Sequence, residues 1–174
     1  GAETGSSEEL TTYEQASGSL PLTGPGVVLV LEDSSPLPSS PGAGAGTVNR
    51  VMDSDVQIAV NGLWSAGAEA ISVNGQRITS TTAIRTAGSA ILVDFRPLSP
   101  PYRTTALGDP AQLRSAVTES ETGEYLAEIS SRYGIGSSWE SEDELEVPAR
   151  SVGTLREAAP LGGGSGNLPE GPRP

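Results

Sequence analysis

Residues 61–78 read NGLWSAGAEAISVNGQRI, and this stretch decides the fold. Asn74-Gly75 is the two-residue turn most typical of a β-hairpin, so it predicts two paired strands, at 70–73 and 76–79. Gly67 stands where a helix ends. The apolar residues before it recur at helical spacing: Met52, Val56, Ala59, Val60, Leu63 and Trp64. We therefore expect an amphipathic helix that packs Leu63 and Trp64 against a sheet and leads directly into a hairpin.

Strand patterns surround this unit on both sides. Val27 to Leu31 is an uninterrupted apolar run, typical of a central strand covered on both faces. Shorter strands are expected at 82–86, 90–96 and 102–107, and a longer one at 137–147. Asp109-Pro110 begins a second helical region, which Gly134 ends. This order predicts an α+β fold, with a mostly antiparallel sheet and helices packed on one face in a ferredoxin-like arrangement.

The chain has 174 residues, enough for one domain of ordinary size. We place a single α+β domain at 20–149. Residues 1–19 are expected to be disordered or to end a longer helix, and residues 150–174 to form a flexible tail rich in Gly and Pro. A second Pro- and Gly-rich stretch, at 33–47, predicts a long loop. The longest clear apolar run is far shorter than the roughly 18–20 residues that span a bilayer.

Composition excludes most catalytic chemistry. The sequence has no Cys, no His and no Lys, which removes thiol and imidazole chemistry, the usual zinc ligands, the P-loop lysine and Schiff bases. We expect no enzyme activity, no cofactor and no metal. The net charge is −12, and nucleic acids or anionic membranes attract concentrated positive charge. The expected partners are therefore neutral or basic, and nucleic acid is not among them.

The last predicted strand carries a series of carboxylates. Alternation along a strand places four of them on one face, namely Glu140, Glu142, Glu144 and Glu146. The other face is expected to hold Trp139, Leu145 and Val147. One interpretation is an interaction surface for a basic partner or for cations. The favoured alternative is a solvated face whose charge prevents other strands from pairing at this edge.

A second candidate site lies beside the predicted hairpin. The residues proposed for an anion-binding pocket there are Asn74, Arg77, Thr82 and Arg85, with Thr79 and Thr81 nearby. The alternative is that Arg77 holds loop carbonyls or a carboxylate such as Glu69.

Other acidic residues leave two weaker alternatives. Asp53 and Asp55, with the Glu32-Asp33 pair, suggest a hard-cation site, although acids in a first helical turn are favoured by the helix dipole alone. A hydrolase that uses only carboxylates needs one buried acid of raised pKa, and three are considered: Glu69, Asp94 and Asp109.

The order of these motifs resembles one bacterial family. The residues that carry the likeness are Thr23-Gly24-Pro25-Gly26-Val27, residues 61–78, Thr82-Ala83-Ile84-Arg85, Ser99-Pro100-Pro101-Tyr102 and Leu107-Gly108-Asp109-Pro110. Together they resemble the bacterial domain of unknown function 881 family over about residues 20–148. Gly62 lies inside the predicted helix, where Gly destabilises the helix by about 1 kcal/mol relative to Ala. Its presence there suggests that another element packs closely against the helix at this point.

The resemblance implies a short cytoplasmic start, one membrane-spanning helix, a coiled coil and then this domain outside the cytoplasm, in proteins often encoded among cell-division and cell-envelope genes. Residues 8–16 would then be the end of the coiled coil, and the chain is expected to self-associate through the part of the coiled coil that lies upstream. The leading hypothesis is an extracytoplasmic scaffold domain that binds envelope proteins or cell-wall material without chemistry. The alternative is a sensor of a small anionic ligand, and the third is a carboxylate-only glycan hydrolase.

Overall fold

A computed structural model describes residues 17–36 and 48–151. The expectations for residues 8–16, for the centre of the Pro- and Gly-rich loop and for most of the 150–174 tail lie outside the described residues. The elements are β1 (Leu22–Glu32), α2 (Asp53–Ser65), β2 (Ala70–Val73), β3 (Gln76–Ile78), β4 (Ile84–Ala87), β5 (Ala90–Val93), β6 (Arg96–Leu98), β7 (Tyr102–Leu107), α3 (Pro110–Thr118), α4 (Glu121–Tyr133) and β8 (Gly136–Val147).

The main sheet has five strands in the order β3-β2-β7-β1-β8, and every neighbouring pair is antiparallel. One helix, α2, connects β1 to β2, and the α3–α4 pair connects β7 to β8. Without the short β3, the order β8-β1-β7-β2 is that of the split βαβ arrangement of ferredoxin-like folds. The predicted α+β class and ferredoxin-like arrangement are confirmed.

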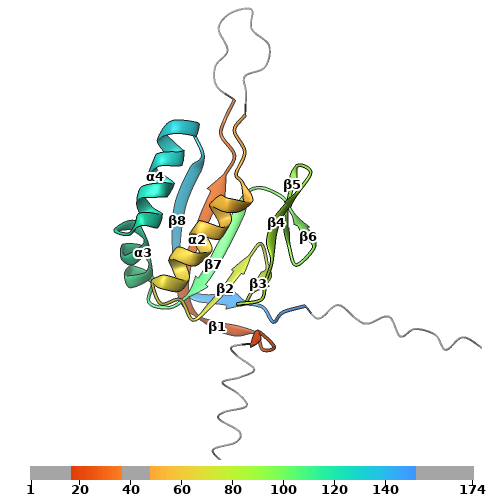
Figure 1. Cartoon of the computed structure of the whole chain (residues 1–174). Coiled ribbons are helices and arrows are strands. Elements are labelled where there is room, and N and C mark those ends of the chain that lie inside the picture. Colours follow the sequence, from red (N-terminus) through yellow and green to blue (C-terminus); the bar gives the residue numbers. More distant parts are fainter. Residues whose placement is uncertain (1–16, 37–47, 152–174) are drawn as a thin grey trace, which may run out of the picture.

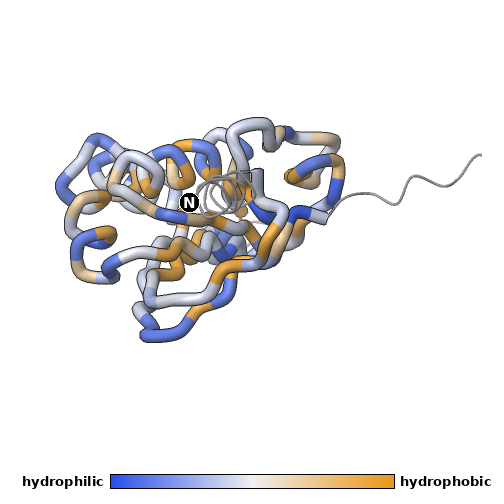
Figure 2. Tube along the Cα trace, turned by 90° about the horizontal axis from the view of Figure 1, so that it is seen from below, coloured by the Kyte–Doolittle hydropathy of each residue, from blue (hydrophilic) through white to orange (hydrophobic). Residues whose placement is uncertain are grey.

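The helices cover one face of this sheet (Figure 1). Alternate residues of β1 reach the core between the two layers, so Val27, Leu29 and Leu31 are fully buried there. Figure 2 shows short hydrophobic segments interleaved with hydrophilic ones along the trace, as expected when each amphipathic element gives one face to a shared core. None of the helices in the described ranges is long and apolar enough to cross a bilayer.

The hairpin predicted at Asn74-Gly75 is present. Ile71 pairs with Ile78, and both turn residues have positive φ, 46° for Asn74 and 78° for Gly75. Two-residue hairpins of this kind require positive φ at both central positions, and this is why the Asn-Gly signal is strong. The predicted ends of the helices at Gly67 and Gly134 and the N-cap at Asp109 are also confirmed.

A second sheet, of strands β4, β5 and β6, was not foreseen. The single strand predicted at 90–96 is wrong, because the chain reverses at Asp94-Phe95 and β6 pairs back on β5. Both turn residues have positive φ, 46° and 66°, a conformation that a bulky residue such as Phe seldom adopts. The sequence therefore held no ordinary turn signal. This sheet contributes Ile91, Val93 and Leu98 to the common core beside α2.

Two ends of the predicted apolar stripe of α2 are exposed. Leu63 is fully buried as expected, but Trp64 is 37% exposed and Met52 is 60% exposed. The prediction that Trp64 packs against the sheet is wrong, because Leu63 and Val60 already occupy the buried face of that turn.

A β-bulge divides the long β1–β8 ribbon. Gly26 pairs with Glu142 and Gly24 pairs with Leu145, so β8 contains one more residue than β1 between these two pairs. Figure 1 shows the first part of β1 running across the bottom of the sheet. Beyond the bulge, Leu145 and Val147 join a small second cluster with Leu22, Ala70 and Leu107, on the face of the sheet away from the helices.

Candidate functional site

A hollow of about 690 Å³ lies between residues 48–52, the start of α2 and the end of α4. We call it the α2–α4 groove. Its lining comprises Val48, Asn49, Arg50, Met52, Asp55, Tyr125, Glu128, Ile129, Arg132, Tyr133 and Ile135.

One wall of the groove, residues 48–52, is fixed to the end of β1. The Ser34 amide donates to the Asn49 carbonyl and the Asn49 amide donates to Ser34 Oγ, each at 2.8 Å. The Val51 amide donates to Asp33 Oδ1 at 2.8 Å. The Asn49 side chain then donates to the Tyr133 carbonyl at the end of α4, at 2.9 Å. The wall is therefore tied both to the sheet and to the opposite helix.

The base of the groove holds a buried carboxylate. Asp55 is 5% exposed, and its two oxygens accept from the Met52 amide, at 2.8 Å, and from the Tyr125 hydroxyl, at 2.5 Å. The hydrogen bond to Asp55, followed by burial, raises the pKa of Tyr125 from 10.0 to about 12. The hydroxyl therefore remains a donor through the physiological range, and the pair connects α2 to α4.

The rim of the groove is apolar and exposed. Among the described residues, six large apolar side chains are exposed, and three of them lie on this rim: Val48 at 42%, Met52 at 60% and Tyr133 at 47%. Exposed apolar side chains gathered around a hollow are typical of binding sites, whereas isolated ones are normal.

Met52 also occupies an unusual position for its residue type. It is the N-cap of α2, and its side chain makes no capping hydrogen bond. Ser, Thr, Asp and Asn are preferred there, since their side-chain oxygens satisfy free backbone N–H groups, typically stabilising the helix by about 1 kcal/mol relative to residues that cannot cap. An exposed Met at this position gives up that stabilisation and places an adaptable apolar side chain on the rim.

The charges on the groove largely compensate one another. Glu128 and Arg132 form an exposed ion pair at 3.0 Å on α4. Asp55 and Arg50 contribute one charge of each sign. The described residues contain no group of three or more acidic, His or Cys side chains placed to hold a metal ion. The arrangement is suited to binding a mixed apolar and polar surface.

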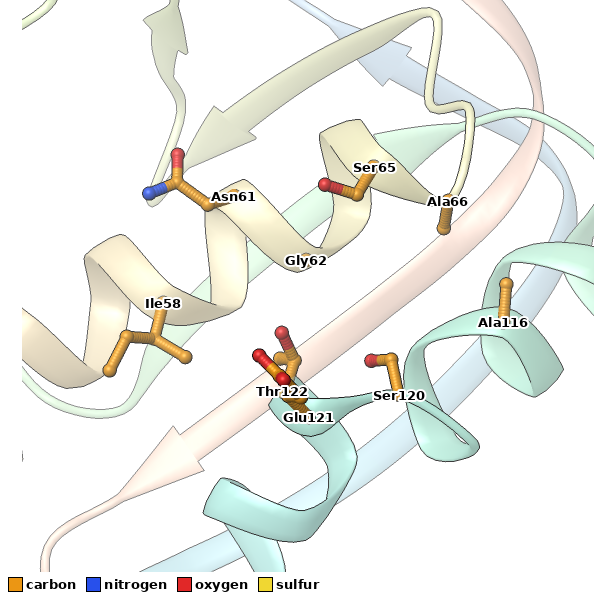
Figure 3. Close-up of a pocket in the computed structure, with 9 residues that line it drawn as sticks. All are labelled: Ile58, Asn61, Gly62, Ser65, Ala66, Ala116, Ser120, Glu121 and Thr122. Carbon is orange, nitrogen blue, oxygen red and sulfur yellow. The ribbon is translucent and has the colours of Figure 1, made fainter.

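A second hollow, of about 440 Å³, lies where α2 passes the start of α4 (Figure 3). Its centre is the close approach of Gly62 to Thr122, where a Cβ on residue 62 would stand 2.6 Å from Thr122 Oγ1. This confirms the close packing expected at Gly62. Figure 3 shows mostly small side chains around it, including Ser65, Ala66 and Ala116. We interpret this hollow as a consequence of helix packing.

The structure separates the residues predicted for the anion pocket. Arg77 is buried, and its Nη1 donates to the carbonyls of Leu20 and Pro148, at 2.9 and 3.1 Å. Burial lowers the pKa of Arg77. Thr82 lies next to it, with its hydroxyl 3.5 Å from the Arg77 carbonyl. The alternative that Arg77 holds loop carbonyls therefore agrees with the structure.

Asn74 and Arg85 do not join Arg77 and Thr82. The Asn74 side chain holds the loop before β7, accepting from the Arg103 amide at 2.7 Å and donating to the Ser99 carbonyl at 3.0 Å. Arg85 pairs with Leu92 on β5, so it lies on the face of the small sheet opposite to Ile84 and Val93, which pack on the core.

The four glutamates of β8 do not share one face. Glu140 and Glu142 lie opposite Val28 and Gly26, whereas Glu146 lies opposite Thr23, beyond the bulge. The one-residue shift moves Leu145 and Val147 to the face of Glu140 and Glu142, and residue 144 falls within the bulge. The predicted division into an acidic and an apolar face is therefore wrong, because strict alternation ends at the bulge. Glu140 pairs with Arg103 at 2.5 Å, and both side chains are 45% exposed.

Five of the remaining candidate carboxylates accept hydrogen bonds from backbone amides. Asp109 accepts from the Gln112 amide at 2.8 Å as the N-cap of α3, and Asp94 accepts from the Ala83 amide at 3.2 Å. Asp33 and Asp55 hold backbone amides, and Asp53 accepts from the Ser54 amide at 2.8 Å.

Sequence reasoning missed the groove itself. It placed Met52 in the buried stripe of α2 and assigned no binding role to Val48, Tyr125 or Tyr133. One signal was available, because Met precedes an acid three residues later where a capping box normally begins with Ser or Thr. The contact of Tyr125 with Asp55 joins two helices 70 positions apart and left no local pattern.

Known proteins similar to this chain fall into one group. The family described as "Bacterial protein of unknown function (DUF881)" matches residues 9–159. The UPF0749 protein Rv1823 of Mycobacterium tuberculosis is 36% identical over 157 residues, which is 88% of this chain and 51% of that protein. The UPF0749 protein YlxW of Bacillus subtilis is 33% identical over 103 residues, 59% of this chain and 43% of that protein.

A solved structure has the same fold. It is the crystal structure of an uncharacterized conserved protein from Mycobacterium tuberculosis, with a TM-score of 0.64 and 28% sequence identity. The match covers 88% of this chain and 99% of that one. The chain spans about half the length of the mycobacterial relative it matches, and less of the Bacillus one.

Proposed function

This chain belongs to the DUF881 family of bacterial proteins of unknown function, and we propose that its α+β domain is a non-catalytic interaction module. The proposed module lies outside the cytoplasm, tethered to the membrane through segments ahead of this chain, and acts as a scaffold near the envelope or division machinery. Tethering, coiled-coil self-association and the cellular setting rest on the family resemblance alone.

Met52 carries the proposal. Its side chain is 60% exposed at an N-cap position where a polar residue would stabilise α2, and it stands on the rim of a groove of about 690 Å³. Local preferences are typically broken at functional sites. The occupant we propose is a segment of a partner protein that places an apolar side chain between Val48, Met52 and Tyr133.

Charge further defines this partner. The chain carries −12 overall, while the groove itself is nearly balanced. A segment with basic residues flanking its apolar anchor would approach the domain with favourable long-range electrostatics, and the apolar contact would then supply most of the affinity. Cell-wall material, which the sequence also suggested as a partner, would bury less apolar surface against this rim.

The test is affinity capture from detergent-solubilised envelope on the immobilised domain. Three baits are compared: the wild type, Met52→Ser and Trp64→Ser. Trp64 is also an exposed apolar residue of α2, but it does not line the groove, so it controls for general stickiness. We expect one or a few envelope proteins to be retained by the wild type and by Trp64→Ser and lost from Met52→Ser.

A purified candidate must then bind the domain directly in solution. Its affinity should be similar for the wild type and Trp64→Ser and weaker for Met52→Ser. Retention of the same proteins by Met52→Ser would contradict the groove as the interface. Turnover of cell-wall glycan by the wild-type domain would contradict the non-catalytic part of the proposal.

A further inference from the structure

A small polar cavity of about 120 Å³ lies between β3, the Asp94 turn, β6 and the segment after β8. Its polar lining residues are Gln76, Arg77, Asp94, Arg96, Arg150 and Ser151. It shares no lining residue with the α2–α4 groove.

The cavity concentrates positive charge in an acidic chain. Three arginines, Arg77, Arg96 and Arg150, line it together with one carboxylate, that of Asp94, whereas the chain as a whole carries −12. Arg150 Nε lies 3.6 Å from Asp94 Oδ2, which compensates one of the three charges. Like charges that face one cavity repel each other, and an anion placed between them removes this repulsion.

We propose that this cavity binds a single oxyanion group, a phosphate or a carboxylate carried by a small ligand. Its volume is enough for one such group and too small for a sugar or a nucleoside to enter beside it. Arginine is the side chain best suited to this task, because its planar N–H donors match the oxygens of carboxylates and phosphates.

The two outer arginines have the geometry for this role. Arg96 pairs with Val93, which places it on the core side of the small sheet, opposite to Arg85. Its Nη2 donates to Ser151 Oγ at 2.6 Å, and Arg150 Nη1 lies 3.5 Å from Thr81 Oγ1. A guanidinium has five N–H donors, so these contacts orient both groups without exhausting them. Arg77 contributes fixed positive charge behind them.

The cavity also lies where the two ends of the described domain meet. The Arg150 amide donates to the Gly18 carbonyl at 2.6 Å, and Arg77 donates to the carbonyls of Leu20 and Pro148. An anion held by Arg96 and Arg150 would therefore also hold the segment at 150–151 against the N-terminal segment. Binding is expected to stabilise this junction as well as the cavity.

The experiment titrates the full 174-residue chain with inorganic phosphate and, in a separate arm, with acetate, at constant ionic strength set with chloride. Thermal unfolding and amide NMR shifts are recorded together. The test variants are Arg96→Gln and Arg150→Gln. The matched control is Arg132→Gln, which removes an arginine from an exposed ion pair on α4, outside the cavity.

We expect a saturable rise in melting temperature, with NMR shifts at Gln76, Arg96 and Ser151. Both test variants should weaken the apparent affinity at least tenfold, and Arg132→Gln should leave it unchanged. Saturation by phosphate alone, or by acetate as well, distinguishes the two oxyanion classes. A response that does not saturate, or one that Arg96→Gln and Arg150→Gln leave intact, overturns the proposal.

Discussion

The Tyr125 hydroxyl on α4 donates a hydrogen bond to the buried carboxylate of Asp55 on α2, across 70 positions of sequence. This bond joins the two helices that form the α2–α4 groove. The hydroxyl donates to Oδ1 of Asp55, while the other carboxylate oxygen, Oδ2, accepts from the Met52 amide at the start of α2. The base of the groove is thus a fully hydrogen-bonded polar pair beneath an apolar rim.

Removing this hydroxyl should destabilise the domain in a pH-dependent way. Tyr125→Phe leaves one oxygen of a buried carboxylate without its donor, which costs about 1–3 kcal/mol at pH 7. Because the folded-state pKa of Tyr125 is raised from 10.0 to about 12, the wild type holds this stabilisation below pH 10 and loses it as the pH rises through 12. Urea denaturation at several pH values measures both effects.

The difference between the two proteins should therefore shrink between pH 10 and pH 12. Tyr133→Phe is the control, because Tyr133 is an exposed tyrosine at the end of the same helix. A constant difference across this pH range would show that the hydroxyl is not held by Asp55.

The close contact between α2 and α4 predicts an unusual response to alanine. Gly62→Ala should lower the free energy of unfolding by about 1–2 kcal/mol, because a Cβ would stand 2.6–2.9 Å from three side-chain atoms of Thr122. In an open helix the same change would stabilise by about 1 kcal/mol. Urea denaturation distinguishes the two signs.

Thr122→Ala offers the matched test, since it removes two of those three atoms. In this background Gly62→Ala should be less damaging than in the wild type. Gly24→Ala, where a Cβ would meet nothing within 4 Å, should stay close to neutral. Equal damage from Gly62→Ala in both backgrounds would locate its cost elsewhere.

Arg77 and Arg85 should behave differently despite their similar roles in the sequence-based hypothesis. Arg77→Ala removes two hydrogen bonds to carbonyls of the chain ends and should cost about 2–4 kcal/mol, in the range typical of buried charged donors. Arg85→Ala, on an exposed strand position, should stay within about 0.5 kcal/mol. Limited proteolysis should also cut near residues 17–20 faster in Arg77→Ala. Equal stability of both variants would refute the structural role of Arg77.

The acidic residues of β8 lie on the free edge of the main sheet. Changing Glu140, Glu142, Glu144 and Glu146 to Gln should leave the unfolding midpoint almost unchanged, since exposed pairs such as Glu140–Arg103 contribute about 0–1 kcal/mol. The variant should, however, self-associate more than the wild type, because charge no longer opposes pairing at this edge. Sedimentation velocity over a concentration series measures this. A variant that sediments like the wild type would exclude edge protection.

Much of the fold was predictable because its signals are local. Asn74-Gly75, Asp109-Pro110 and Gly134 each fix a backbone conformation that few other residues favour, so they marked a turn, a helix start and a helix end correctly. Apolar spacing then identified most of the buried side of α2 and the interior position of β1 in the sheet.

Several errors arose where the sequence carries no local signal for the backbone or for the contacts that the fold makes. The turn at Asp94-Phe95 carries positive φ without glycine, and the bulge opposite Pro25 reverses the faces of β8 without changing its composition. Likewise, the groove is assembled from residues 48–52 and α4, which meet only after folding. The residue types in the sequence favoured a binding domain, but only the tertiary structure shows which of them lie together in a candidate site.

The most direct test of the interaction-module account is one substitution with two readouts. Met52→Ser introduces a good N-cap, so it should raise the free energy of unfolding by about 0.5–1 kcal/mol. The same change removes the apolar anchor, so the dissociation constant for the captured envelope partner should rise at least tenfold, while Trp64→Ser leaves it unchanged. A stabilised domain that binds its partner as tightly as the wild type would contradict the account.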